Sequence, residues 1–169
     1  FDAGARVHFH ANSGLIVANN ASIQVNGSAS TTEKLENEVI FEGDRLEPDF
    51  ADVPGQWGTI WLTDGSTNNN LNHLTIKNAT IGLLIQNNDG TTVNLKNTQI
   101  YNSTNYGILA QTAKIKGENI VINDAGLAGL ACSYGGDYSF THCTFNNNWS
   151  SSNQVAVSIS NYLTGAIPE

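Results

Sequence analysis

Short alternations of apolar and polar residues fill most of the chain. Val7-His8-Phe9-His10 puts two apolar side chains on one side and two histidines on the other, and Leu15-Ile16-Val17 and Ile23-Gln24-Val25 follow after polar turns. A period of two residues is typical of β-strands, and turns rich in Asn and Gly set the strands' ends. The pattern therefore predicts an all-β fold built from many short strands.

One five-residue phrase recurs between Leu71 and Trp149. Its central apolar positions follow one another at steps of 24, 22 and 23 residues, and they are Ile76, Ile100, Ile122 and Phe145. A polar turn residue closes each copy at the same steps, namely Asn78, Asn102, Asp124 and Asn147. A fixed period of this length is typical of a solenoid.

Each repeat holds three short strands, so the apolar positions form three columns. The first column is Leu71, Val93, Ile115 and Tyr138. The second is Leu74/Ile76, Thr98/Ile100, Ile120/Ile122 and Cys143/Phe145. The third is Leu83/Ile85, Ile108/Ala110, Leu130/Cys132 and Val155/Val157. A leucine-rich repeat has a similar period but needs a Leu-rich consensus that this chain lacks. A sandwich or meander also has short strands and turns, but it requires no recurring phrase.

The spacing predicts a parallel β-helix with three short strands per rung, 22–24 residues per rung and roughly seven rungs. Stacked turns then place like residues on like, with aliphatic columns inside. The residues Asn78, Asn102, Asp124 and Asn147 are expected to stack as an asparagine ladder at one corner, because Asn and Asp tolerate the left-handed backbone conformation.

The chain resembles the right-handed parallel β-helix proteins of the pectate-lyase-like superfamily, whose turns often carry such a ladder. It is most similar to the β-helix repeat domains of bacterial surface and secreted proteins, through Gly4-Ala5-Arg6-Val7-His8-Phe9, Ile23-Gln24-Val25-Asn26-Gly27 and Val39-Ile40-Phe41-Glu42-Gly43. The resemblance implies a fold rather than an activity, because that fold hosts lyases, hydrolases, epimerases and non-catalytic adhesins.

We expect residues 1–169 to form one β-helix domain that is part of a longer chain. Two stretches interrupt the repeat and are interpreted as excursions from it, at 28–37 and 42–56. A long loop within a compact fold is often functional, and the second excursion is rich in charged side chains. We therefore expect a binding site in this region.

Composition narrows the classes of partner. Charged residues make up 13% of the chain and the formal net charge is −8. A chain with this balance lacks the basic surface that binds nucleic acid or anionic membranes. No apolar run approaches the roughly 20 residues of a membrane span. We expect an extracellular or cell-surface location in a bacterium, with glycans or other surface proteins as partners.

The second excursion supplies the candidate ligand-binding residues, which are Asp44, Arg45, Glu47, Asp49 and Asp52. Several carboxylates close in sequence are suited to Ca²⁺, which takes six to eight oxygen ligands. The alternative is a solvated loop in which Arg45 pairs locally. Trp57 and Trp61 are candidates for an aromatic platform under sugar rings, the alternative being that at least one of them belongs to the core.

The histidines and cysteines carry weaker signals. His8 and His10 share one strand face, either as two metal ligands without an evident third or as exposed histidines. His73 and His142 fall in one lane three rungs apart, about 14 Å by the strand spacing, so they do not share a metal. Cys132 and Cys143 are expected inside as free thiols, with a disulfide left open.

No catalytic constellation is evident in the sequence. Lys77 and Lys96 are expected to point outward one rung apart without a row of carboxylates beside them, although a polysaccharide lyase of this fold uses a base beside Ca²⁺-binding carboxylates. The leading hypothesis is a non-catalytic scaffold, adhesin or glycan-binding module without a cofactor. The alternatives are a fragment of a carbohydrate-active enzyme and a structural subunit of a larger surface assembly.

Overall fold

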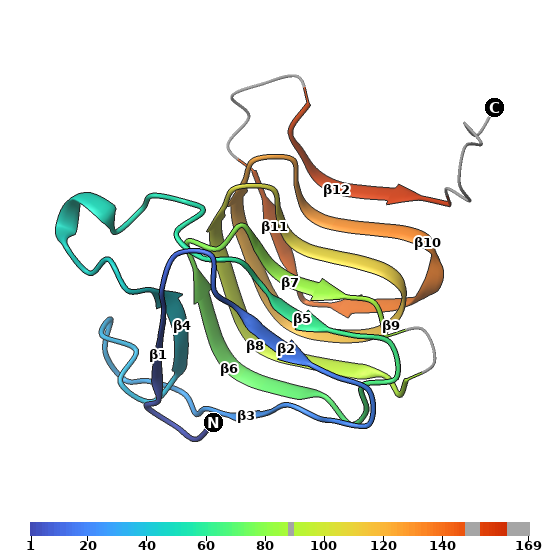
Figure 1. Cartoon of the computed structure of the whole chain (residues 1–169), viewed down its shortest axis with the longest axis horizontal. Coiled ribbons are helices and arrows are strands. Elements are labelled where there is room, and N and C mark those ends of the chain that lie inside the picture. The colour runs from blue at the N-terminus through green and yellow to red at the C-terminus, as the bar shows by residue number, and fades with distance from the viewer. Residues whose placement is uncertain (88–89, 148–152, 162–169) are drawn as a thin grey trace.

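The computed structural model describes residues 1–87, 90–147 and 153–161. The chain is all-β, with 2% helix, and winds as a parallel β-solenoid of about four turns (Figure 1). The strands in chain order are β1 (Arg6–Phe9), β2 (Leu15–Val17), β3 (Gln24–Asn26), β4 (Val39–Gly43), β5 (Ile60–Leu62), β6 (Asn70–Lys77), β7 (Ile81–Ile85), β8 (Val93–Ser103), β9 (Tyr106–Ala125), β10 (Ala128–Thr141), β11 (Thr144–Asn146) and β12 (Val155–Ser160). One short 3₁₀ helix, η1 (Pro48–Phe50), lies in the second excursion.

The strands stack into three faces, because the longer strands bend at corners and continue onto the next face. The first face is formed by β3 and parts of β6, β8, β9 and β10. The second is formed by β1, β4 and β11 with parts of β6, β8 and β9. The third is formed by β2, β5, β7 and β12 with parts of β9 and β10.

The second and third apolar columns are confirmed in their central rungs. Ile76, Ile100 and Ile122 are consecutive register partners, and so are Leu83, Ile108 and Leu130. All six side chains are at most 3% exposed. Strand alternation together with a constant repeat length therefore placed these side chains inside correctly.

Two registers differ from the prediction. Leu71 pairs with Leu95 and not with Val93, whereas Val93, Ile115 and Tyr138 are register partners as predicted. Each strand is aligned by its distance from the corner that follows it, and Leu71 and Leu95 both lie two residues before a corner residue of left-handed φ. In the last strand Leu130 pairs with Val157 and not with Val155, and Val157, which was expected inside, is 41% exposed.

The solenoid makes about four turns and not the seven rungs expected. The irregular first third of the chain explains the difference. Ile40 and Thr75 are register partners 35 residues apart, whereas Thr75 and Gln99 are only 24 apart. The two excursions therefore use residues that a uniform period would assign to further rungs.

Large aromatic side chains fill the interior at the N-terminal end. The rings of Phe9 and Trp57 stack with centroids 4.3 Å apart, and Phe41 meets Phe9 edge-on at 5.9 Å. Trp57 is 1% exposed. Aromatic burial contributes strongly to core stability, so this cluster replaces the aliphatic columns of the regular rungs.

Residues of positive φ mark two corners of each regular turn. One corner carries Asn78, Asn102 and Asp124 at φ of 60°, 57° and 54°, which confirms the expected left-handed conformation at three of the four ladder positions. The other corner carries His73, Asn97, Asn119 and His142, with φ between 49° and 54°. There the amides bond along the axis: Asn97 donates to Asn72 at 3.0 Å, and Asn119 donates to Asn97 at 2.8 Å.

Candidate functional site

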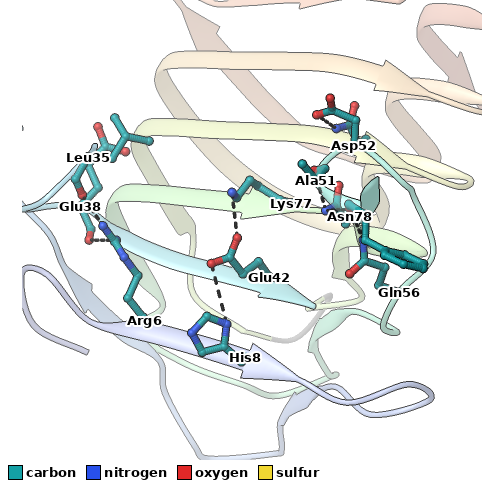
Figure 2. A network of polar contacts seen from close by, with 12 residues as sticks. Arg6, His8, Leu35, Glu38, Glu42, Ala51, Asp52, Gln56, Lys77 and Asn78 are labelled. Carbon is teal, nitrogen blue, oxygen red and sulfur yellow. Dashed lines mark hydrogen bonds and ion pairs between the residues drawn. The ribbon is translucent and has the colours of Figure 1, made fainter. Parts of the chain in front are cut away.

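The outward side of the second face lies between the two excursions, which both project from the side of β1 and β4 (Figure 1). Excursion 28–37 joins β3 to β4 and is held at one edge by Arg6. The Arg6 guanidinium donates to the carbonyl oxygens of Lys34, Leu35 and Glu38 at 3.1, 3.0 and 3.1 Å (Figure 2). Three hydrogen bonds from one planar cation fix the position of this loop.

Excursion 42–56 is held at the opposite edge by the predicted ladder. Asn78 donates through Nδ2 to the carbonyl oxygen of Ala51 at 3.0 Å, and Asn102 donates to the carboxylate of Asp52 at 3.2 Å (Figure 2). Gln56 closes the loop on itself by donating to the carbonyl oxygens of Phe50 and Val53 at 2.6 and 2.9 Å. The ladder at this corner therefore anchors the loop in addition to forming the turn.

A charged cluster occupies the face between the two anchors. The Glu42 carboxylate lies 2.7 Å from Lys77 Nζ and 3.8 Å from His8 Nδ1 (Figure 2). Strand pairing brings the three together, because His8 is the register partner of Glu42, and Phe41 pairs with Ile76 just before Lys77. Lys77 thus has a single carboxylate beside it and not a row of them. Lys96 likewise pairs with Glu118, at 3.1 Å, on the first face.

Tyr101 continues the same outward lane as the register partner of Lys77. Burial, with a smaller contribution from the carboxylates of Glu42, Glu38 and Asp52, raises the pKa of Tyr101 to about 12. Its hydroxyl therefore stays protonated at neutral pH, where it is a hydrogen-bond donor. Nearby, the buried Glu38 carboxylate accepts a hydrogen bond from Thr75 Oγ1 at 2.7 Å.

Two clefts flank the second face, each made by one excursion and one corner. The first cleft, of about 310 Å³, is lined by Asp52, Pro54, Asn102, Ser103, Thr104, Asp124, Ala125, Gly126, Asn147 and Gln154. The second cleft, of about 320 Å³, is lined by Ala29, Ser30, Glu38, His73, Asn97, Gln99, Asn119 and Val121. Both are at the low end of the volumes that small-molecule sites occupy.

The charged residues of the second excursion do not converge on one ligand. Asp44 pairs with His10 at 2.5 Å, and this contact is the main reason that the pKa of Asp44 is lowered. Arg45 pairs with Glu47 at 3.2 Å and lies 3.8 Å above the ring of Phe50.

Asp49 is exposed in the first turn of η1. Of the five predicted residues, Asp52 is the one that lines either of the two clefts described above. Among the described residues, no three His, Cys, Asp or Glu side chains gather in a group that is able to hold a metal ion.

The two tryptophans do not form a platform. Trp57 is a core residue whose Nε1 donates to the Lys77 carbonyl oxygen at 2.8 Å, so the prediction of a sugar contact at Trp57 is wrong. Trp61 is half-buried on the outward side of the third face and donates to Gln86 Oε1 at 2.8 Å. It is on another face from the cluster at Glu42.

The histidines and cysteines do not gather into a site. His8 and His10 each meet one carboxylate, and His73 and His142 are residues of the second corner. Cys132 is buried and Cys143 half-buried, and both are free thiols. Burial raises the pKa of Cys132 to about 11, so this thiol is inert at neutral pH.

The cluster of His8, Glu42, Lys77 and Tyr101 was not predicted, because the repeated phrase is defined by its apolar positions. The sequence does contain a signal for it: aligning Val7, Phe41 and Ile76 as inward residues places His8, Glu42 and Lys77 side by side. The outward-facing positions of these strands therefore hold the residues of the cluster.

Comparison with protein-family models, with curated proteins and with solved structures found no match for this chain. In the part of the chain that the structure describes, no helix has the length and apolar character needed to cross a membrane.

Proposed function

We propose that the protein is a non-catalytic, extracytoplasmic β-solenoid module of a bacterial surface protein that binds glycans on its second face. The observation that carries the proposal is the outward side of this face, where polar side chains lie between two anchored excursions with a cleft at each edge. Right-handed coiling and membership of the pectate-lyase-like superfamily are part of the same proposal.

The chemistry of the face supports a glycan over other partners. Sugars present many hydroxyl groups, and this face offers them a carboxylate, an ammonium, an amide and a phenol, supplied by Glu42, Lys77, Gln99 and Tyr101. Preformed polar groups on a rigid scaffold lose little conformational entropy on binding. The adhesin and scaffold roles both use such a surface.

The same geometry favours binding over catalysis. Glycoside hydrolysis uses two carboxyl groups on either side of the scissile bond, one of them as an acid. Here Glu42 is engaged by Lys77 and His8, and Glu38 is buried against Thr75. The acids of the second excursion are spread over separate partners.

Sedimentation with insoluble polysaccharides, together with a glycan array, tests the proposal. Lys77→Ala and Tyr101→Ala are expected to weaken retention. Lys96→Ala is the matched control, because it is also an outward lysine paired with a glutamate but lies on the first face.

Retention of no glycan by the wild type, or equal loss in Lys96→Ala, would overturn the proposal. Assays for released reducing or unsaturated ends on the same samples address the enzyme alternative. Turnover that disappears in the Lys77→Ala variant would replace the binding module with a carbohydrate-active enzyme.

A further inference from the structure

A buried carboxylate opens into the second cleft. Glu38 lies at the corner beside His73, because the residue that follows it, Val39, is the register partner of Leu74. Glu38 is 8% exposed and lines the cleft. Its Oε2 accepts a hydrogen bond from Thr75 at 2.7 Å, whereas its Oε1 has no hydrogen-bond or ion-pair partner among the described residues. One oxygen of a nearly buried acid is therefore left for a ligand.

The free oxygen of Glu38 is not sealed inside the protein. In the described part of the chain, the sealed side-chain atoms without a partner belong to Gln56, Asn78, Asn87 and Ser103, and Glu38 Oε1 is not among them. Hydrogen bonds to a buried charged group are costly to leave unmade. A ligand that donates to Oε1 from the cleft removes this cost, so Glu38 is evidence for an occupant that is independent of the shape of the cleft.

The described residues do not supply a cation to this carboxylate. Arg6 donates to main-chain carbonyl oxygens and not to the Glu38 side chain, and Lys77 is paired with Glu42. None of the described residues that line the cleft is Lys or Arg. A carboxylate that is withdrawn from water without a paired cation repels a second anion strongly. The cleft therefore disfavours sugars that carry carboxylate or sulfate groups.

The floor of the second cleft suits a sugar ring. Thr75, Gln99 and Val121 follow one another as register partners on the outward side of the second face. The Gln99 side-chain amide has no hydrogen-bond partner among the described residues, so it offers both donors and an acceptor. Val121 is 42% exposed, and its methyl groups are suited to the carbon-bound hydrogens of a ring.

The same strands connect the two clefts. β8 runs from Gln99 in the second cleft to Ser103 in the first, and β9 runs from Val121 in the second to Ala125 in the first. Tyr101 lies between Gln99 and Ser103 on the outward side of the face. A glycan chain with one residue in the second cleft therefore has a path across the face toward the first.

We propose that the second cleft binds an uncharged sugar residue whose hydroxyl groups donate to Glu38, and that Glu38 excludes anionic sugars. Within the proposed function, on which this assignment rests, the ligand is thus a neutral glycan. The ring packs on Val121, Gln99 bonds to a further hydroxyl, and the chain continues past Tyr101 toward the first cleft.

An array of neutral, uronic-acid, sulfated and amino glycans tests the assignment. The wild type should retain neutral glycans and reject the uronic and sulfated ones. Glu38→Gln keeps the size of the side chain and its contact with Thr75, and it should weaken binding of the best-retained neutral glycan about tenfold in titration calorimetry. It should also narrow the preference for neutral over anionic glycans, which a merely structural role of Glu38 would leave unchanged.

Glu118→Gln is the matched control, because it removes the same charge from a glutamate that pairs with Lys96 on the first face, outside the cleft. A second pair of variants keeps the test decisive if Glu38→Gln folds poorly. Val121→Ala should weaken binding of the neutral glycan about threefold. Val53→Ala is its control, since Val53 is 41% exposed in the second excursion and does not line the cleft. Neither control should change the affinity or the preference.

Retention of uronic or sulfated glycans as strongly as neutral ones would overturn the exclusion of anions while leaving glycan binding in place. Retention of amino glycans alone would overturn the hydroxyl contact in the same way. Unchanged binding by Glu38→Gln and Val121→Ala would overturn the location in the second cleft. Retention of no glycan by the wild type would overturn the function itself.

Discussion

At the residue scale, the unusual feature of the second face is a tyrosine held beside three acids. Burial is the main cause of the raised pKa of Tyr101, and Glu42, Glu38 and Asp52 add to it. A folded-state pKa of about 12 against an ordinary 10 makes the folded protein bind the proton more tightly than the unfolded chain between those values. The stability linked to this proton is complete below pH 10 and is lost as the pH rises toward 12.

A comparison of wild type with Tyr101→Phe measures this linkage. Urea melts at pH 8 and pH 11 should show that the wild type loses more stability than the variant over this interval, because phenylalanine has no proton to lose. Ultraviolet difference titration of the wild type should show one tyrosine ionising near pH 12 that is absent from the variant. Parallel loss of stability in both proteins would refute the burial of Tyr101 beside the acids.

Two asparagines on β8 differ in role: Asn97 both adopts a left-handed backbone and forms hydrogen bonds, whereas Asn94 only forms a hydrogen bond. Asn97 has φ of 49° and bonds with Asn72 and Asn119. Asn94 lies on the same strand, is exposed, and donates to Asn70 at 2.9 Å without the left-handed backbone. We expect Asn97→Ala to lower the free energy of unfolding by about 2 kcal/mol, from left-handed strain and lost hydrogen bonds.

Asn94→Ala is the matched control and should cost less than about 0.5 kcal/mol, because it is a surface substitution. Urea denaturation of both variants measures the difference. Equal effects would mean that the left-handed corner conformation of Asn97 contributes nothing beyond the side-chain hydrogen bonds, and would contradict a stabilising role of the ladder.

At the element scale, the alternation of each strand divides interior from surface one residue at a time. Ile122 is fully buried, whereas its neighbour Val121 is 42% exposed on the outward side of the second face. Ile122→Ala should cost about 2–5 kcal/mol through lost burial and a residual cavity. Val121→Ala should cost less than about 0.5 kcal/mol. Urea melts that rank the two variants equally, or in reverse, would refute the assigned strand faces.

The elements also show why parts of the fold followed from the sequence and others did not. A rung of constant length makes the partner of Ile100 predictable, since Ile76 and Ile122 lie at nearly equal steps in a repeated phrase. The first strands of the rungs are aligned by the corner residue that follows them. That residue is His73 in one turn and Asn97 and Asn119 in the next two. That substitution hid the second ladder and displaced the predicted partner of Leu71.

At the scale of the whole molecule, most of the residues predicted for a binding site lie apart from one another. The second excursion does border a cleft, but only Asp52 lines it, because Asp44 and Glu47 find partners in His10 and Arg45. Trp57 lies in the core and stacks on Phe9, a pairing that a repeat derived from the central rungs does not indicate. Contacts between residues 28 or more apart, such as Arg6 with Lys34, are set by the path of the excursions.

The regular rungs and the two excursions thus have different structural roles. The rungs supply a rigid stack with columns of buried aliphatic residues, and its corners anchor the loops through Asn78 and Asn102. The loops turn one flat strand face into a bounded surface with a cleft at either edge. We propose that glycans bind at that surface.

The most direct test is a two-dimensional ¹H–¹⁵N NMR titration of the labelled protein with the glycan retained best on the array. We predict that the amide shifts change around Asp52, from Asn102 to Thr104, and at Ala125 and Gly126, while the amides of Trp61 and Gln86 on the third face stay in place. Shifts confined to the third face, or none at saturating glycan, would contradict the account.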